Sequence, residues 1–166
     1  MPEIRELAAR VQLVVFDVDG VFTDGRLYYG ADGETLKCFH VRDGHGIKSL
    51  LQQGVQVAVI SGRSSKAVTR RMQELGIRHV FQGDDDKRPL LEQLQKKLGV
   101  APEQTACVGD DLADLPLMQA VGLAIAVADA QPKVRAQAQW CTRAAGGQGA
   151  VREICDLILA ARNTRG

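Results

Sequence analysis

The chain alternates between short apolar runs and segments in which apolar residues recur with a helical spacing. The apolar runs are rich in Val, Ile, Leu and Ala and are bounded by Gly, Asp or Ser. Runs of this length and composition are typical of strands buried on both faces of a parallel sheet. We therefore predict strands at residues 13–18, 55–61, 79–83, 105–110 and 123–128.

The segments between these runs carry helical patterns. Residues 68–75 have apolar side chains at i, i+4 and i+7, and residues 91–98 have them at i, i+3 and i+7, with Gly99 placed to end that helix. A further apolar stripe runs through residues 151–158. Alternating strands and helices predict an α/β fold with a doubly wound, Rossmann-like parallel sheet, and we expect residues 1–166 to form a single domain.

One segment interrupts this alternation. Residues 25–41, GRLYYGADGETLKCFHV, contain two strand-like runs on either side of GADG. A Gly- and Asp-rich stretch between two such runs is a hairpin turn signal. The sequence therefore predicts a β-hairpin that projects just after the first strand.

The overall charge is close to neutral, since 21 Lys and Arg oppose 20 Asp and Glu and leave a net charge of +1. This balance gives no electrostatic reason to expect nucleic acid or an anionic membrane as a partner. The N-terminal segment MPEIRELAAR lacks the apolar stretch of a signal peptide, and no run approaches the roughly 18 apolar residues of a membrane span. The four cysteines form no CxxC pair. We expect a cytoplasmic protein that binds neither nucleic acid nor membrane.

Chemically suggestive side chains follow several of the predicted strands. In doubly wound sheets, ligands bind beyond the carboxyl ends of the strands, where the strand order reverses. The residues in such positions are Asp17 and Asp19 after the first strand, Ser61 and Gly62 after the second, Lys87 after the third, and Asp110, Asp111 and Asp114 after the fourth.

Each of these groups has a structural alternative when it is taken alone. Asp17 could cap a loop, the acids of VGDDLAD could cap a helix N-terminus, Ser61 could belong to a turn, and Lys87 could be a solvated surface lysine. The occurrence of all four groups, in this order and at successive strand ends, favours a site for phosphoryl transfer.

The acids suggest how such a site would work. Carboxylate oxygens are ligands that suit Mg²⁺, and Asp17 and Asp110 could share one ion if their strands are neighbours. Asp17 could attack phosphorus and form an aspartyl-phosphate, while Asp19 protonates the leaving alkoxide and later activates water. Lys87 would add positive charge, and the Ser61 hydroxyl would donate a hydrogen bond to a phosphate oxygen.

The motifs FDVDGVFTDG, VISGR, GDDDK and VGDDLADLPLM resemble motifs one to four of the haloacid dehalogenase superfamily of phosphatases. The resemblance covers nearly the whole chain. It implies that Asp17 is the nucleophile and Asp19 the acid and base, and that Ser61 and Lys87 bind and neutralise the phosphate. It also implies a Mg²⁺ site made by Asp17, Asp110 and the backbone carbonyl of Asp19.

A closer resemblance is to the family of 3-deoxy-D-manno-octulosonate 8-phosphate phosphatases, which release free Kdo for the inner core of lipopolysaccharide. It is carried by DGVFTDG, FHVRDGHGI, AVADA and GGQGAVREICDLIL. The resemblance implies an enzyme without a cap domain, with which the short hairpin agrees. It implies a homotetramer in which neighbours help to close each active site, and a tail, residues 146–152, that folds over a site. Asp111 and Asp114 would support the metal site, and Asp114 could reach a metal-bound water.

The same resemblance implies how the sugar acid phosphate is bound. Kdo 8-phosphate carries a carboxylate and a phosphate, and guanidinium groups suit both anions. The sequence departs from the family at His40, where the pattern FNVRDG has Asn. The expected substrate-binding residues are Asp19, His40, Val41, Arg42, Asp43, Gly44, Ser61, Gly62, Arg63, Arg71 and Lys87.

Two alternatives stand beside this hypothesis. One is a phosphatase of the same subfamily that acts on another sugar acid phosphate, such as a nine-carbon sialic-type 9-phosphate. The other is a receiver domain, which also combines an acidic Mg²⁺ site with a Ser or Thr and a Lys but stores the phosphoryl group. The DxD spacing of Asp17 and Asp19 favours turnover over storage. The sequence leaves open the rates and affinities, the divalent ion used, and whether the tail closes over its own or a neighbouring site.

Overall fold

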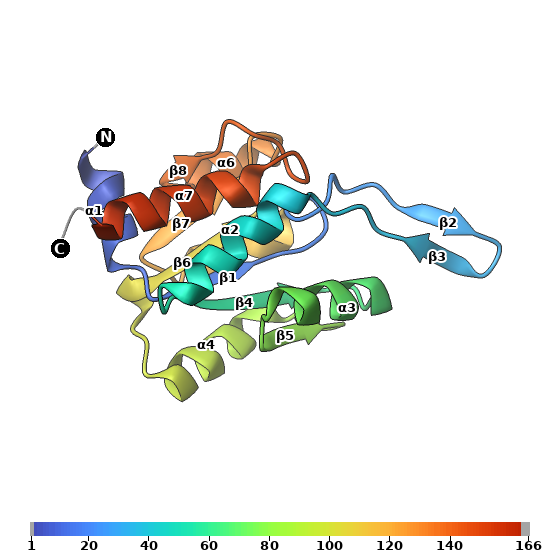
Figure 1. The fold of residues 1–166 in the computed structure, drawn as a ribbon, viewed down its shortest axis with the longest axis horizontal. Coiled ribbons are helices and arrows are strands. Elements are labelled where there is room, and N and C mark those ends of the chain that lie inside the picture. The colour runs from blue at the N-terminus through green and yellow to red at the C-terminus, as the bar shows by residue number, and fades with distance from the viewer. Residues whose placement is uncertain (1, 164–166) are drawn as a thin grey trace.

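The fold is a six-stranded parallel sheet flanked by helices (Figure 1), and the computed structural model of the chain describes residues 2–163. Five strands confirm the predicted runs: the apolar residues of four of them are buried in the core, and those of the strand at residues 79–82 are partly buried against it. The strands of the sheet are β1 (Leu13–Phe16), β4 (Gln56–Ser61), β5 (His79–Gln82), β6 (Thr105–Gly109), β7 (Leu123–Ala126) and β8 (Trp140–Cys141).

The strands lie in the order β5-β4-β1-β6-β7-β8, and every pair in the sheet is parallel. Counted along the chain without the hairpin, this is the Rossmann order 3-2-1-4-5-6, whereas receiver domains follow the order 2-1-3-4-5. The predicted doubly wound fold is confirmed. The strand order reverses between β1 and β6, which makes the carboxyl ends of these two strands the expected place for a ligand.

The helices form two groups that each pack together: α1, α7, α2 and α3 in one, and α4, α5 and α6 in the other. In Figure 1, α2 and α7 run side by side in front of the sheet. Their apolar stripes face the core, which is why residues 151–158 carry the pattern seen in the sequence. The helices are α1 (Pro2–Arg10), α2 (Val41–Gln52), α3 (Lys66–Leu75), α4 (Lys87–Leu98), α5 (Leu115–Met118), α6 (Pro132–Gln137) and α7 (Ala150–Asn163), with the 3₁₀ turns η1 (Pro102–Gln104) and η2 (Leu112–Asp114).

The predicted hairpin is present and projects away from the sheet (Figure 1). It is formed by β2 (Tyr28–Gly30) and β3 (Gly33–Leu36), which pair antiparallel. It is shorter than the predicted segment, because residues 25–27 and 37–40 belong to neither strand and α2 begins at Val41. Residues 17–40 hold these two strands and no helix, so this insertion contains no cap domain.

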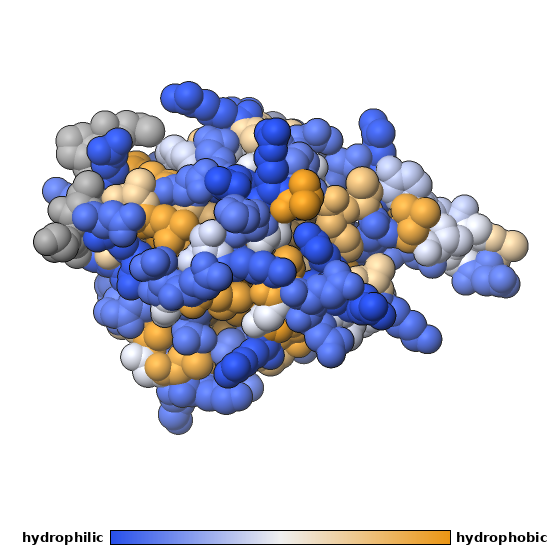
Figure 2. All heavy atoms as spheres, viewed as in Figure 1, coloured by the Kyte–Doolittle hydropathy of each residue, from blue (hydrophilic) through white to orange (hydrophobic). Residues whose placement is uncertain are grey.

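The exposed surface is mixed. Hydrophilic side chains cover most of the face seen in Figure 2, with apolar ones scattered among them. None of the described helices is long and apolar enough to cross a membrane. Several of the large apolar side chains that stay exposed belong to the hairpin and its base, namely Leu27, Tyr28, Tyr29 and Leu36.

Candidate active site

The loop after β1 is anchored to the core by its own apolar residues. Phe22 packs edge-to-face on Phe16, with ring centroids 5.3 Å apart. Three successive amides of the loop donate to the Val18 carbonyl. Because the apolar side chains turn inward, the alternating residues Asp17 and Asp19 are left partly exposed at the edge of the sheet. The buried residues of this loop include Val18, Val21 and Phe22.

The register of the sheet brings the predicted acids together. Phe16 at the end of β1 pairs with Val108 of β6, and the Asp17 amide donates to the Val108 carbonyl over 3.1 Å. Since β1 lies between β4 and β6, Asp17 is placed between Ser61, which ends β4, and Asp110, which follows β6. The carboxyl ends of parallel strands meet at one edge, as the sequence predicted.

Three carboxylates form one cluster at this edge. Asp17, Asp110 and Asp114 each offer an oxygen atom, and these atoms lie within 4.8 Å of one another. Gly20 closes the cluster from the loop side: its φ is +86°, and a Cβ at this position would collide with the Asp110 carboxylate. A glycine is required there both by the positive φ and by the close approach.

The Lys87 ammonium group lies against this cluster. Lys87 is the first residue of α4, and its side chain is only 4% exposed. Its Nζ donates to Asp17 Oδ1 over 3.1 Å and to Asp114 Oδ1 over 2.7 Å. Burial alone would lower the pKa of Lys87, but the charges of Asp17 and Asp114 raise it above its ordinary value. Lys87 is therefore a buried cation and not the surface lysine of the structural alternative.

One lysine does not balance three acids. Burial, followed by the charges of Asp17 and Asp114, raises the pKa of Asp110 to about 8. Burial and the charge of Asp114 raise the pKa of Asp17 to about 6. The cluster therefore still holds a proton at neutral pH when no further positive charge is present. A divalent cation would supply that charge.

The donor set fits Mg²⁺. Asp110 Oδ1 is buried and accepts no hydrogen bond from any described residue. Asp114 differs, because its Oδ2 accepts from the amides of Asp110 and Asp111 and its Oδ1 from Lys87. Both oxygens of Asp114 are thus occupied, whereas Asp17 and Asp110 keep oxygens for a hard cation. This arrangement agrees with a supporting role for Asp114. Asp19 lies outside the carboxylate cluster, so only its backbone carbonyl remains a candidate ligand.

The predicted phosphate-binding segment follows β4. Ser61 is 3% exposed, and its carbonyl accepts from the Gly83 amide over 3.0 Å. Gly62 and Arg63 lie in the loop before α3, which begins only at Lys66. They are thus close to the N-terminus of α3 without belonging to the helix, and their amides do not take part in the hydrogen bonds of its first turn.

The Asp19 carboxylate faces the base of the hairpin. Asp19 Oδ1 accepts from Lys37 Nζ over 2.6 Å, and Asp19 Oδ2 lies 3.7 Å from Arg63 Nε. Glu34 Oε2 in β3 receives both cations, Lys37 Nζ at 3.1 Å and Arg63 Nη2 at 3.2 Å. Desolvation raises the pKa of Glu34, but hydrogen bonds from Lys37 and Arg63 outweigh it and hold this pKa below its ordinary value. Sequence reasoning missed Glu34 and Lys37, since charged residues in a hairpin are usually solvated.

The segment FHVRDG forms the start of α2 and has mixed roles. His40 is the N-cap, and its Nδ1 accepts from the Arg42 amide over 3.1 Å. Val41 and Arg42 are exposed. Asp43 is 1% exposed, and its Oδ1 accepts from the backbone amide of Arg152 in α7 over 2.9 Å. The Asp43 carboxylate thus joins α2 to α7, while its Oδ2 has no partner among the described residues.

Arg71 reaches this segment from α3. Its guanidinium group lies against Gly44, where a Cβ would collide with Nη2. Its Nη1 also lies 3.6 Å from Glu74 Oε2. The predicted substrate-binding residues therefore fall into two groups. Ser61, Gly62 and Arg63 lie beside the Asp17 and Asp19 loop, and the FHVRDG segment with Arg71 forms a second group around the start of α2.

The tail loop packs against the loop after β1. The Gly147 amide donates to the Val21 carbonyl over 3.0 Å, and Gly147 has a φ of +70°. A Cβ on Gly146 would collide with the Gly20 carbonyl oxygen. Within one chain, the tail therefore supports the loop that carries Asp17 and Asp19.

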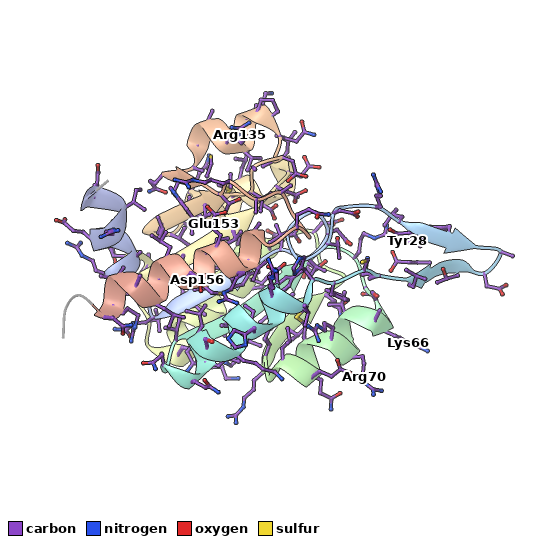
Figure 3. All side chains as sticks on the ribbon, turned by 45° about the horizontal axis from the view of Figure 1, so that its top comes forward. Tyr28, Lys66, Arg70, Arg135, Glu153 and Asp156 are labelled. Atoms are coloured by element: carbon purple, nitrogen blue, oxygen red, sulfur yellow. The ribbon has the colours of Figure 1, made fainter. Side chains whose placement is uncertain are left out.

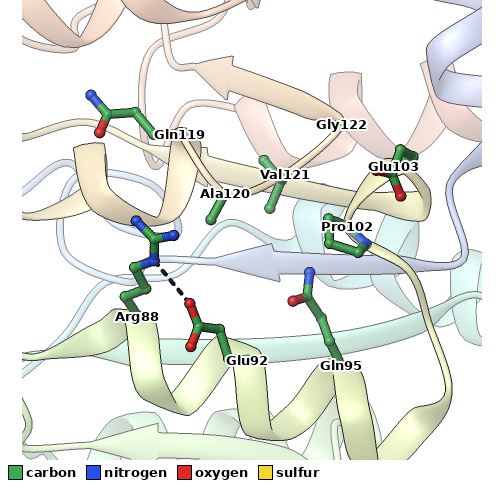
Figure 4. A pocket seen from close by; sticks show the side chains of 9 residues that line it. All are labelled: Arg88, Glu92, Gln95, Pro102, Glu103, Gln119, Ala120, Val121 and Gly122. Atoms are coloured by element: carbon green, nitrogen blue, oxygen red, sulfur yellow. Dashed lines mark hydrogen bonds and ion pairs between the residues drawn. The ribbon is translucent and has the colours of Figure 1, made fainter.

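A further cavity of about 350 Å³ lies elsewhere in the molecule (Figure 4). It is bordered by α4, by η1 and by the turn between α5 and β7. Two of its charged side chains, Arg88 and Glu92, pair with each other over 2.9 Å. Its lining includes none of the acids of the cluster and no buried charged group without a partner among the described residues. It therefore gives no argument for a second active site.

Known proteins resemble this chain over nearly its whole length. The family of haloacid dehalogenase-like hydrolases matches residues 78–154. The 3-deoxy-D-manno-octulosonate 8-phosphate phosphatase of Escherichia coli (strain K12) is 50% identical over 155 residues, 93% of this chain and 82% of that protein. The enzyme of the same name from Yersinia pestis is 48% identical and covers 97% of this chain and 86% of its own length.

Solved structures agree with this. The Yersinia pestis enzyme has a TM-score of 0.95 at 48% identity, over 97% of this chain and 87% of that one. The phosphatase from Moraxella catarrhalis, solved with a magnesium ion, a phosphate ion and a KDO molecule, has a TM-score of 0.95 at 44% identity, over 99% of this chain and 94% of that one. Sequence, fold and acidic cluster thus agree, and the chain belongs to the haloacid dehalogenase-like hydrolases, in the family of 3-deoxy-D-manno-octulosonate 8-phosphate phosphatases.

Proposed function

We propose that this protein is a Mg²⁺-dependent phosphatase that hydrolyses 3-deoxy-D-manno-octulosonate 8-phosphate to free Kdo and phosphate, and so serves lipopolysaccharide core biosynthesis. The observation that carries the proposal is the convergence of Asp17, Asp110 and Lys87 at the reversal of strand order, with Asp19 on the same loop. The substrate is supported by the relatives of that name and by the KDO molecule in the Moraxella catarrhalis relative.

The carboxylates of Asp17 and Asp110 and the backbone carbonyl of Asp19 would hold the Mg²⁺ ion. When bound, Mg²⁺ supplies positive charge that offsets the repulsion between an attacking carboxylate and a phosphate. The Asp114 carboxylate keeps Lys87 and the Asp110 backbone in place, because it accepts three hydrogen bonds, from Lys87 Nζ and from the amides of Asp110 and Asp111. Lys87 neutralises a phosphate oxygen, and the Ser61 hydroxyl donates a hydrogen bond to another.

In the first step, a carboxylate oxygen of Asp17 attacks phosphorus and forms a new P–O bond. The bond between phosphorus and the sugar oxygen breaks, and Asp19 gives its proton to that oxygen, so that free Kdo leaves as an alcohol. Lys87 Nζ donates to Asp17 Oδ1 over 3.1 Å, which orients the nucleophilic carboxylate.

In the second step, Asp19 accepts a proton from water. The water oxygen attacks phosphorus, the P–O bond to Asp17 breaks, and inorganic phosphate is released with the Asp17 carboxylate restored. Asp19 is then protonated again for the next cycle. The same carboxyl group thus acts first as an acid and then as a base.

Substrate recognition uses the arginines around the site. Arg63 is 46% exposed and can turn toward an anion at the edge of the Asp19 loop. We propose that Arg63 and Arg71, with residues 40–44, receive the sugar acid and its carboxylate. In this chain, His40 fixes the start of α2 through its bond to the Arg42 amide, so its exchange for the family's Asn keeps a cap at this position.

The assembly is a further part of the proposal. We propose that residues 1–166 form one domain, that the protein acts in the cytoplasm, and that four copies associate. The exposed apolar residues of the hairpin support association, because Tyr28 (Figure 3) and Tyr29 project on an element that leaves the body of the molecule. Apolar side chains on a projecting hairpin are expected to be covered by another copy.

The test is phosphate release with Mg²⁺ from Kdo 8-phosphate, measured beside sialic-type 9-phosphates, hexose phosphates and nucleotides. We expect a strong preference for Kdo 8-phosphate and loss of turnover in Asp17→Asn, which should still fold. Preference for a sialic-type phosphate would keep the mechanism and replace the substrate. Full activity of Asp17→Asn would contradict the assignment of the nucleophile.

A further inference from the structure

Four charged side chains form a closed ring at the base of the hairpin. Lys37 Nζ contacts Asp19 Oδ1 at 2.6 Å and Glu34 Oε2 at 3.1 Å. Arg63 contacts the same Glu34 oxygen through Nη2 at 3.2 Å and lies 3.7 Å from Asp19 Oδ2 through Nε. The charges alternate around the ring and sum to zero, so each carboxylate is flanked by two cations.

The ring treats the two oxygens of Asp19 differently. Oδ1 accepts a short hydrogen bond from Lys37. Among the described residues, Oδ2 has one charged neighbour, Arg63 Nε at 3.7 Å, and this distance is too long for a hydrogen bond. Oδ2 is therefore the oxygen that is left to carry a proton to the leaving group or to take one from water.

The two cations differ in exposure, and this separates their roles. The Lys37 side chain is 2% exposed and the Arg63 side chain is 46% exposed. Arg63 can exchange its ring partners for a substrate anion. Lys37 is too buried to reach the substrate, and among the described residues its ammonium group pairs with two carboxylates of the protein, Asp19 and Glu34.

We propose that Lys37 is a positioning residue for Asp19, and that Glu34 holds Lys37 and Arg63 in place from the hairpin. This role rests on the proposed phosphatase function, in which Asp19 moves the protons. Lys37 fixes the Asp19 carboxylate through Oδ1 and aims Oδ2 at the reacting atoms. The hairpin thereby contributes to catalysis from within its own chain, besides its exposed apolar surface.

The proposal has an energetic basis. Removing the Lys37 ammonium leaves Asp19 and Glu34 as neighbouring carboxylates with Arg63 as their shared partner. Breaking a buried ion pair by removing one member leaves the other charge without compensation. Asp19 would then turn toward Arg63, and the proton-transfer oxygen would move from its position. A misplacement of about 1 Å near reacting atoms costs roughly 10²-fold in rate.

The test compares Lys37→Met with Lys37→Arg, which keeps the charge, and with Lys133→Met, a control at an exposed lysine of α6. Each is assayed with Mg²⁺ on the sugar acid phosphate and on p-nitrophenyl phosphate, whose leaving group needs no proton. We expect Lys37→Met to lose roughly 10²-fold in kcat on the sugar acid phosphate, with KM nearly unchanged. On p-nitrophenyl phosphate, Lys37→Met should give a full initial burst of nitrophenol, because this leaving group needs no proton from Asp19. A slow steady state should follow, because Asp19 is still needed to activate water in the second step.

The outcomes are distinct. Recovery of most of kcat in Lys37→Arg and wild-type kinetics in Lys133→Met would support the role. For Lys37→Met, an unchanged kcat or a defect confined to KM would overturn it. A burst whose amplitude falls as much as the steady-state rate would also overturn it, because a smaller burst indicates fewer folded sites. If the wild type released no phosphate from any compound, the proposed function itself would fail. If the wild type turned over and Lys37→Met matched it, only the role of Lys37 would fail.

Discussion

Replacing Lys87 by Met should destabilise the metal-free protein strongly. Lys87 and Asp114 are 4% and 1% exposed, and Asp17 is 13% exposed. Removing the lysine leaves two carboxylates facing each other with Asp110 beside them. Breaking a buried pair in this way typically costs about 3–5 kcal/mol. At about 2–4 °C per kcal/mol for a chain of this size, the expected loss in Tm is roughly 6–20 °C.

The matched control is Arg88→Met, at the next residue of α4. Arg88 pairs with Glu92 on the surface, where the two side chains are 52% and 58% exposed. Exposed pairs of this kind contribute about 0–1 kcal/mol because water and salt screen them. Both variants remove one positive charge from the same helix. The difference between their free energies of unfolding therefore reports the effect of burial and not that of net charge.

The assay is urea unfolding in EDTA at several pH values, repeated with Mg²⁺. The charge of Lys87 lowers the pKa of Asp17, so without Lys87 this pKa lies further above its value in the unfolded chain and the folded variant binds more protons. Its stability is then present at low pH and is lost as the pH rises, and its deficit against the wild type should grow from pH 5 to pH 8. Mg²⁺ should recover part of the deficit. Equal stability of Lys87→Met and Arg88→Met at pH 8 would show that the buried ion pairs of Lys87 do not stabilise the fold.

Further predictions concern the same edge of the sheet. In EDTA, Asp110→Asn should become more stable relative to the wild type as the pH rises from about 4 to about 8, because the folded pKa of Asp110 is raised to about 8 and its ionisation disfavours the folded state; a difference that does not change with pH would contradict this. Calorimetry in buffers of different ionisation enthalpy should show that Mg²⁺ binding releases protons near pH 7, and binding without proton release would count against the raised pKa values. Gly20→Ala should abolish Mg²⁺ binding, since its Cβ would collide with Asp110 at a φ of +86°; Gly33→Ala, also at positive φ but with no atom within 4 Å, is the control for backbone strain. Gly147→Ala should lower kcat by disturbing the loop after β1, and unchanged kinetics would exclude the tail from the site.

Much of the site could be predicted from the sequence because parallel strands end at a common edge. The strands β1, β4 and β6 are continuous apolar runs, and the polar residues that end them must converge once the strands are neighbours. Asp17, Ser61 and Asp110 are placed in this way. These residues lie close together because their strands pair in one register, and no specific side-chain contact is needed to explain it.

Other features depend on contacts that the sequence pattern does not encode. Strand β8 has only two residues and exists through pairing with β7. Asp43 binds the Arg152 amide across 109 positions of the chain. Lys37 resembles any charged hairpin residue until the hairpin base folds onto the Asp19 loop. In each case the partner is brought near by tertiary structure, so local periodicity and propensity carry no signal of it.

The C-terminal segment could also be predicted only in part. The stripe at residues 151–158 was enough to predict a helix, and α7 indeed buries Val151, Ile154, Cys155 and Ile158. The sequence did not show that the preceding loop, through the Gly147 amide, supports the loop after β1. Because α7 packs on α1 and α2, deleting the chain from Gly146 onward would remove part of the core. Substitution at Gly147 is therefore the sharper test of this loop.

If Asp17 carries the phosphoryl group during turnover, the phosphorylated protein can be trapped. Asp19→Asn should be mixed with p-nitrophenyl phosphate and Mg²⁺, quenched in acid within the burst, and digested for mass spectrometry. We predict one phosphoryl group on the peptide that contains Asp17, formed as fast as nitrophenol is released, and none in the Asp17→Asn, Asp19→Asn double variant. Nitrophenol release with no phosphoprotein, or a phosphoryl group on another residue, would contradict it.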